Sequence, residues 1–104
     1  MNTRRTNKAE SPPGIENLRS AILSVTRKHG VRNVRVFGSF ARNEQRRRSD
    51  VDLLVDLPER FSLFDLAGLT IDLEEAIGRK VDVVPSDSIK PVLRASILSD
   101  ARQL

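Results

Sequence analysis

Apolar residues recur along the chain at two spacings, one typical of helices and the other of strands. Helical spacing is found over residues 15–29, 62–77 and 88–101. Strands are expected at three short valine-rich runs, residues 34–37, 51–55 and 81–84. Helices and strands therefore alternate, which predicts a small α/β (α+β type) domain with a mixed three- to four-stranded sheet covered by helices. The pattern leaves open whether the first two strands pair parallel or antiparallel.

The predicted helices carry recognisable end signals. Gly30 can end the first helix in the left-handed conformation, and Gly78 can end the second. Ser62 with Asp65 three residues later matches a capping box at the start of the second helix. Ser88 is expected to cap the last helix.

The length of 104 residues allows one domain, with residues 1–13 predicted to form a flexible basic tail and residues 14–104 the domain itself. Charge is divided unevenly along the chain. Residues 1–48 hold 12 Lys and Arg against 3 acids, a charge of +9, whereas residues 49–104 hold 6 against 11, a charge of −5. A basic half followed by an acidic half suits a site for both metal cations and an anionic ligand, although from charge alone an accident of surface composition is the favoured explanation.

The residue types that are absent from the chain, and the lack of a long apolar run, exclude several kinds of site and location. The absence of cysteine excludes disulfides, thiolate metal sites and cysteine nucleophiles. With no apolar run near the roughly 20 residues that span a bilayer and no apolar leader, we expect no membrane contact and a cytoplasmic location. The lack of Trp and Tyr argues against base stacking and disfavours, without excluding, direct binding of nucleic acid.

Three aspartates interrupt the valine-rich runs. Asp50 and Asp52 are two residues apart, so on a strand they point to one face, about 7 Å apart, while Val51 and Leu53 point to the other. Asp82 repeats the pattern in the next run, and pairing of the two strands would bring all three carboxylates to one patch. Oxygen-only ligands favour Mg²⁺ or Mn²⁺, and three carboxylates suit a two-metal phosphoryl-transfer site. A merely solvated sheet face is the alternative.

The basic half contains a candidate phosphate site. Gly38 and Ser39 follow a predicted strand, where backbone N–H groups and the hydroxyl can bind a phosphate that Arg42 could also reach. An ordinary turn with a helix cap is the alternative. The triplet Arg46–Arg48 has three interpretations: a solvated loop, a clamp on a triphosphate, or a patch for an acidic or nucleic-acid partner.

The combination of Gly38-Ser39, ten further residues, and Asp50-x-Asp52 resembles the signature of the DNA polymerase β-like nucleotidyltransferase superfamily. Residues 36–42, 49–55, 62–66 and 78–84 extend the likeness to its minimal members, the MNT antitoxins that pair with HEPN-domain ribonuclease toxins. The resemblance covers residues 31–104. One departure is Asn43, where such proteins commonly carry Gly, and Asn tolerates the left-handed conformation better than most residues.

The resemblance implies a polymerase β-like core and transfer of AMP from ATP to a hydroxyl, with release of pyrophosphate. In the MNT–HEPN pairs the acceptor is a toxin tyrosine; the present chain contains no Tyr, which fits an acceptor on a partner. The implied roles are phosphate binding by Gly38, Ser39 and Arg42, ligation of both metals by Asp50 and Asp52, and ligation of the hydroxyl-activating metal by Asp82, also a candidate base.

Two other function classes compete with the enzyme. The domain could neutralise a toxin by contact alone, or it could act as a nucleic-acid-binding regulator through its basic half, although no helix-turn-helix is evident. Replacing Asp50 and Asp52 by Asn separates enzyme from contact inhibitor, because only the enzyme would lose neutralisation.

Overall fold

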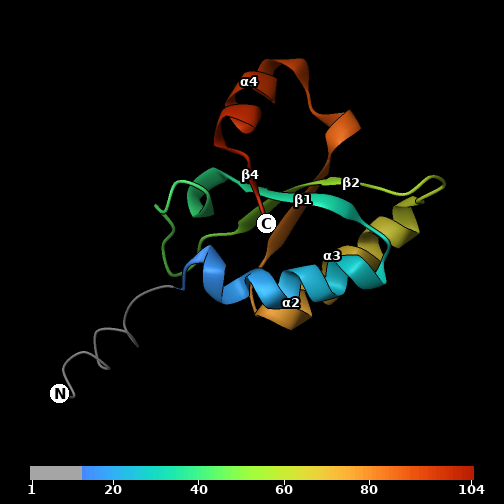
Figure 1. Ribbon diagram of the computed structural model, residues 1–104, viewed down its shortest axis with the longest axis horizontal. Helices are drawn as coiled ribbons and strands as arrows, with labels where there is room; N and C mark the ends of the chain where they lie inside the picture. Colours follow the sequence, from blue (N-terminus) through green and yellow to red (C-terminus); the bar gives the residue numbers. More distant parts are fainter. Residues whose placement is uncertain (1–12) are drawn as a thin grey trace.

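The computed structural model describes residues 13–104, so the tail predicted for residues 1–13 lies outside the described residues except for Pro13. Helices and strands alternate along the chain (Figure 1). In chain order they are α2 (Ile15–Lys28), β1 (Arg32–Phe37), the 3-10 turn η1 (Gly38–Phe40), β2 (Val51–Asp56), α3 (Leu63–Ile77), β3 (Val81–Pro85), the 3-10 turn η2 (Ser86–Ser88), α4 (Pro91–Asp100) and β4 (Arg102–Gln103).

The strands form one mixed sheet in the order β3-β2-β1-β4. β1 pairs antiparallel with both β2 and β4, and β2 pairs parallel with β3. The parallel pair is joined through α3, which is the crossover that parallel strands require. The predicted α/β class and mixed sheet are therefore confirmed, and the question of how the first two strands pair is answered as antiparallel.

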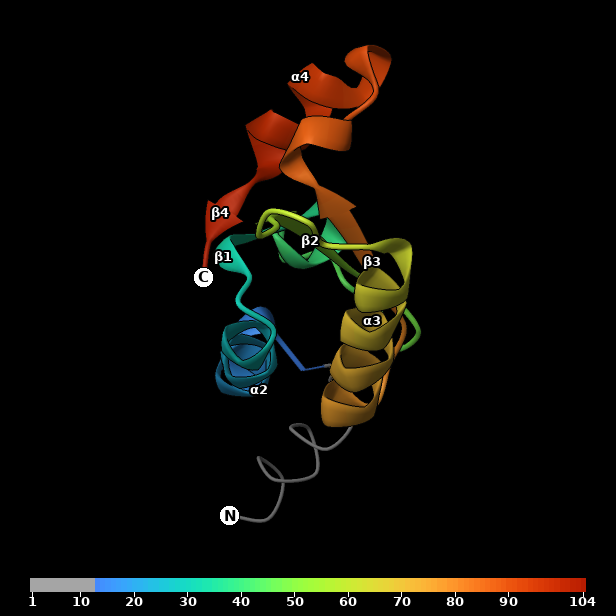
Figure 2. The same ribbon diagram turned by 90° about the vertical axis from the view of Figure 1, so that its right-hand side faces the viewer.

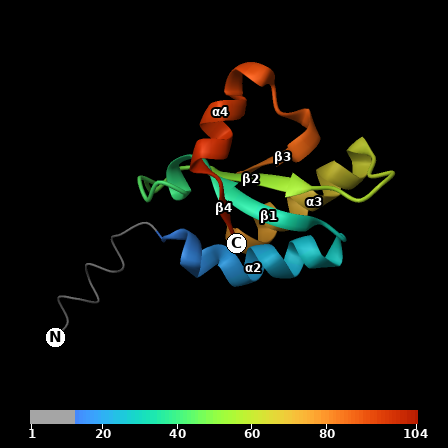
Figure 3. The same cartoon turned by 45° about the horizontal axis from the view of Figure 1, so that its top comes forward.

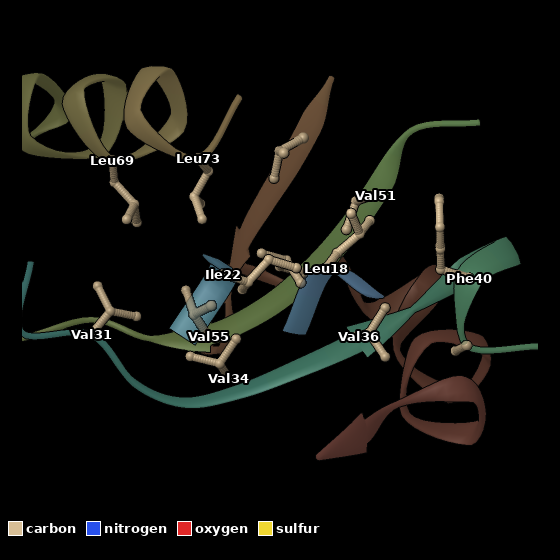
Figure 4. Packing of buried hydrophobic residues seen from close by; sticks show 13 residues of the cluster. Leu18, Ile22, Val31, Val34, Val36, Phe40, Val51, Val55, Leu69 and Leu73 are labelled. Carbon is tan, nitrogen blue, oxygen red and sulfur yellow. The ribbon is translucent and has the colours of Figure 1, made fainter. Parts of the chain in front are cut away.

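The sheet lies between two unequal helical layers. α2 and α3 lie side by side on one face, and α4 lies on the other (Figures 2 and 3). The main core fills the space between the sheet and the α2–α3 layer, where Val51, Leu53 and Val55 are completely buried (Figure 4). α4 contributes no buried residue. Within residues 13–104, no helix is both long and apolar enough to cross a bilayer.

The capping box expected at the start of α3 is present. The Asp65 backbone N–H donates to the Ser62 hydroxyl at 3.0 Å, and the Ser62 N–H donates to the Asp65 carboxylate at 2.8 Å. Two N–H groups that the helix cannot satisfy are thereby paired. Gly78 ends the helix with φ of 71°, the left-handed conformation predicted for it.

The prediction for the C-terminal region was wrong in two respects. Ser88 does not cap the last helix; it ends η2, and α4 begins at Pro91, whose fixed φ and missing N–H suit the first turn of a helix. The helix also stops at Asp100 instead of continuing to Ala101, and the chain then adds β4 to the edge of β1. The Leu104 N–H donates to the Val34 carbonyl at 2.9 Å. The residues after Asp100 therefore form hydrogen bonds with β1 and do not continue the helix.

Candidate active site

The glycine–serine bend lies directly against one of the aspartates. β1 ends at Phe37, and Gly38 turns the chain into η1 with φ of 74°, a conformation that glycine adopts without strain. A β carbon at this position would collide with Oδ2 of Asp52 and would lie 3.2 Å from its Cγ. The absence of a side chain at Gly38 therefore allows the bend and the carboxylate to approach each other.

Sheet register brings two of the three aspartates together. Asp52 and Asp82 are direct partners in the parallel pairing of β2 and β3, so the condition under which the sequence predicted that these carboxylates meet is fulfilled for this pair. Val51 and Val81, on the opposite face, are buried. Asp50 precedes β2 rather than belonging to it, and its side chain is exposed.

The carboxylates of Asp50, Asp52 and Asp82 gather at the edge of the sheet where β2 and β3 begin, and their charges repel one another. The pKa of Asp52 is raised to about 6, first by burial and then by the neighbouring carboxylates of Asp82 and Asp50, while Arg42 acts in the opposite direction. Both effects disfavour the ionised carboxylate. A cation bound at this edge would relieve the repulsion and restore the charged form.

The donor chemistry suits a divalent cation, but the ligand set is incomplete. Among residues 13–104, no group of three or more His, Cys, Asp or Glu side chains is placed to hold a metal ion by itself. Mg²⁺ is commonly bound by one or two carboxylates together with substrate phosphates and water, not by an all-protein cage. The Asp52–Asp82 pair fits that mode of binding, and the assignment of Asp50, Asp52 and Asp82 as metal ligands remains a prediction.

Arg42 is engaged by protein carboxylates. Its Nε donates to Glu44 at 3.0 Å and its Nη1 donates to Asp100 at the end of α4. These two hydrogen bonds, that of Glu44 first, raise the pKa of Arg42. The side chain thus ties the segment after η1 to α4, and its predicted contact with a phosphate would have to compete with these acids. Asn43 adopts φ of 58°, the left-handed conformation expected from the resemblance, in which Gly is common at this position.

Residues 46–49, directly before Asp50, form a short closed turn. The Ser49 N–H donates to the Arg46 carbonyl at 3.0 Å, and the Arg46 N–H donates to the Ser49 hydroxyl at 2.7 Å. The turn exposes all three side chains of Arg46–Arg48.

Sequence reasoning did not identify Arg79, which contacts two segments of the site. Its guanidinium lies over the ring of Phe40 and donates to the carbonyl of Ser49. The only local signal was an arginine placed two residues before the strand that carries Asp82.

Comparison with known proteins identifies relatives over most of the chain. The nucleotidyltransferase domain family model matches residues 18–104. A Methanocaldococcus jannaschii protein, provisionally named a protein adenylyltransferase, is 45% identical over 87 residues, which cover 84% of this chain and 94% of that protein. Protein adenylyltransferase MntA of Thermococcus cleftensis is 41% identical over 71 residues, 68% of this chain and 72% of that protein.

Solved structures share the fold. One described provisionally as a minimal nucleotidyltransferase is 43% identical, with a TM-score of 0.76 over 88% of this chain and 97% of that chain. A toxin–antitoxin crystal structure with AMP-PNP gives 0.71 at 24% identity, covering 81% and 69% of the two chains. A tri-AMPylated Shewanella oneidensis HEPN toxin in complex with MNT antitoxin gives 0.67 at 20% identity, covering 85% and 69%. The last two likenesses concern the fold alone.

Proposed function

The chain belongs to the nucleotidyltransferase domain family and is an AMP-transferring enzyme, and we propose that it acts as an antitoxin that AMPylates a HEPN-domain ribonuclease toxin. The donor is ATP, the acceptor is a hydroxyl of the toxin, and pyrophosphate is released. The observation that carries the proposal is the contact of the Gly38 bend with Asp52, whose register partner is Asp82. A phosphate bound at the bend would therefore lie next to the carboxylates of Asp52 and Asp82.

The reaction proposed is a substitution at the α-phosphorus of ATP. The acceptor oxygen forms a bond to this phosphorus, the bond to the β-phosphate oxygen breaks, and the electron pair leaves with pyrophosphate. Gly38 and Ser39 would bind the phosphates through backbone N–H groups and the serine hydroxyl. Asp82, which is exposed and is the register partner of Asp52, would accept the proton of the acceptor hydroxyl.

Divalent cations would be held by Asp52, Asp82 and Asp50 together with the triphosphate. When bound, they would stabilise the charge on the attacking and leaving oxygens. Without them, the carboxylates at this edge repel the triphosphate as well as one another, so these side chains alone do not favour binding of an anionic nucleotide.

A separate protein supplies the acceptor in this proposal. The chain has no tyrosine, so it cannot modify itself at that residue type. The fold is shared with the MNT antitoxin found in complex with a tri-AMPylated HEPN toxin, which supports a toxin of that class as partner. ATP as donor is supported by the related fold in the complex with AMP-PNP.

The proposal is tested by incubating the purified protein with ATP, Mg²⁺ and a HEPN-domain protein from the same genome, followed by intact mass spectrometry of that partner. We expect a mass gain of whole AMP units, abolished in the Asp50→Asn/Asp52→Asn double variant. Glu75→Gln, at an exposed position, is the control for a change of charge away from the site.

An unchanged partner mass across several nucleotides and metals would overturn the enzymatic proposal. The contact-inhibitor alternative makes a separate prediction: the double variant would still silence the ribonuclease activity of the partner although no AMP is transferred.

A further inference from the structure

Arg79 lies between α3 and β3, and its side chain reaches two segments that border the candidate active site. Its Nη1 donates to the backbone carbonyl of Ser49 at 3.0 Å. Its guanidinium carbon lies 5.2 Å from the ring centroid of Phe40, which is within the range of a cation–π contact. One half-buried side chain therefore contacts the residue before Asp50 and the residue that follows Ser39.

The contact at Ser49 matters because Asp50 lies outside the sheet ladder. β2 begins at Val51, whose N–H donates to the Lys80 carbonyl at 3.0 Å. Asp50 is thus held on one side by this backbone hydrogen bond and on the other by the hydrogen bond from Arg79 to Ser49. Both bonds lead to the two residues that precede β3, the strand that carries Asp82.

The contact at Phe40 fixes the other component of the site. Phe40 is buried and ends η1, the turn that begins with Gly38. A guanidinium can stack its plane on an aromatic ring while its edge donates hydrogen bonds, which an ammonium group cannot do in the same way. Arg79 is consequently suited to fix the distance between the Gly38 bend and the Asp50 backbone.

Arg79 is not engaged in charge pairing among the described residues. Within residues 13–104, the ion pairs formed by arginines involve Arg35 and Arg42 but not Arg79. Its contacts are a neutral carbonyl and an aromatic ring, both of which restrain position. We propose that Arg79 is a positioning residue that holds Asp50 beside the Gly38–Ser39 bend; this inference rests on the proposed function, since it assigns Asp50 to the nucleotidyl-transfer site.

The test compares Arg79→Lys and Arg79→Ala with the control Lys80→Ala. Lys80 is the exposed neighbour, and its replacement removes one positive charge while leaving its backbone hydrogen bond in place. We expect kcat for AMP transfer to fall about ten- to a hundred-fold in both Arg79 variants, because small displacements of reacting groups have effects of that order. KM for ATP should change less than about three-fold, and Lys80→Ala should match the unmodified protein.

A readout independent of turnover is the affinity for Mn²⁺ in the presence of a non-hydrolysable ATP analogue. We expect Arg79→Ala and Asp50→Asn each to weaken Mn²⁺ binding, and the double variant to be no weaker than Asp50→Asn, because Arg79 acts through Asp50. Additive effects in the double variant would overturn the inference. Arg79→Lys retains the charge and the aliphatic stem, so it provides the same comparison if Arg79→Ala does not fold.

The proposed function fails if the unmodified protein transfers no AMP, whereas the inference can fail while AMP transfer is observed. If Asp50→Asn abolishes AMP transfer and Arg79→Lys behaves like Lys80→Ala, the proposed function stands and the positioning role is wrong. If Asp50→Asn leaves AMP transfer intact, the assignment of Asp50 is wrong, and with it the positioning role.

Discussion

The backbone of Gly38 lies so close to the carboxylate of Asp52 that no β carbon fits between them. Gly38 directly follows β1 and Asp52 lies near the start of β2, and Phe37 is the register partner of Asp52. The contact therefore follows from antiparallel pairing of these strands followed by a turn at Gly38. Its consequence is that a phosphate held by the bend would lie next to the acidic edge of the sheet.

Replacing Gly38 by Ala is predicted to abolish AMP transfer. The added methyl group would displace the Asp52 carboxylate, and the φ of 74° would add backbone strain of about 1–2 kcal/mol. Gly78→Ala is the matched control, because Gly78 has φ of 71° but no atom within 4 Å of the added β carbon. Urea unfolding should show a similar decrease in the free energy of unfolding for both variants, caused by the backbone strain. Activity should be lost only in Gly38→Ala. Retained activity in Gly38→Ala would show that this close approach is unimportant.

The elevated pKa of Asp52 predicts a specific pH dependence of stability. Its ordinary pKa is 3.8 and its pKa in the folded protein is about 6, so the folded state favours the protonated form. The stabilising contribution is complete below about pH 4 and is lost as the pH rises through 6. For a fully buried carboxylate, the contribution of this pKa shift to the free energy of unfolding would be about 3 kcal/mol. Asp52 is half-exposed, and solvent screening reduces the contribution to about 1 kcal/mol.

Asp52→Asn should therefore match the parent protein near pH 4 and become more stable than it by about 1 kcal/mol near pH 7.5, in denaturant unfolding without metal. Asp56→Asn is a control of opposite sign, because hydrogen bonds from Ser86 and then Asn33 lower the pKa of Asp56. That variant should lose stability at neutral pH and recover relative to the parent protein as the pH falls below 4. A pH-independent difference for Asp52→Asn would contradict the prediction.

Local patterns in the sequence predicted the parts of the fold that depend on neighbouring residues. Alternation of aspartate and valine places Asp52 and Asp82 on the face opposite the core because strand periodicity is a local property. The capping box at Ser62 is likewise contained in four residues. Sequence resemblance, by contrast, supplied the pairing of the glycine–serine bend with the aspartates, since nothing local relates residues 12 positions apart.

The features that sequence reasoning missed depend on contacts between distant residues. The sequence did not show that Arg42 binds Asp100, which lies 58 residues further along the chain; its contact with a phosphate stays a prediction. Arg79 reaches Ser49 across 30 residues. Neither side chain could be assigned a partner before the arrangement of the sheet was known. β4 has only two residues, too few to show an alternating pattern, and it exists because the edge of β1 offers hydrogen-bonding groups.

The capping box at Ser62 gives a prediction about stability alone. Ser62→Ala removes the acceptor for the Asp65 N–H and should reduce the free energy of unfolding by about 1 kcal/mol. Ser88→Ala is the control, since among residues 13–104 the Ser88 hydroxyl donates a hydrogen bond only to the exposed carboxylate of Asp87, at 3.3 Å. This variant should change stability by less than about 0.5 kcal/mol. Equal effects of the two substitutions in urea unfolding would contradict the assignment of Ser62 as the cap.

Attachment of α4 to the domain is predicted to depend on the ion pair between Arg42 and Asp100. No residue of α4 is buried, so packing contributes little to its stability, and the pair connects the C-terminal end of the helix to the segment after η1. Asp100→Ala should therefore speed amide hydrogen exchange throughout residues 92–100 while leaving α3 unchanged. Glu44→Ala removes the other carboxylate partner of Arg42 without touching α4 and should leave exchange in the helix unaltered. If Asp100→Ala leaves the exchange of α4 at its original rate, the helix is held by its backbone connections to η2 and β4. Arg42 could then turn toward a phosphate without detaching α4 from the domain.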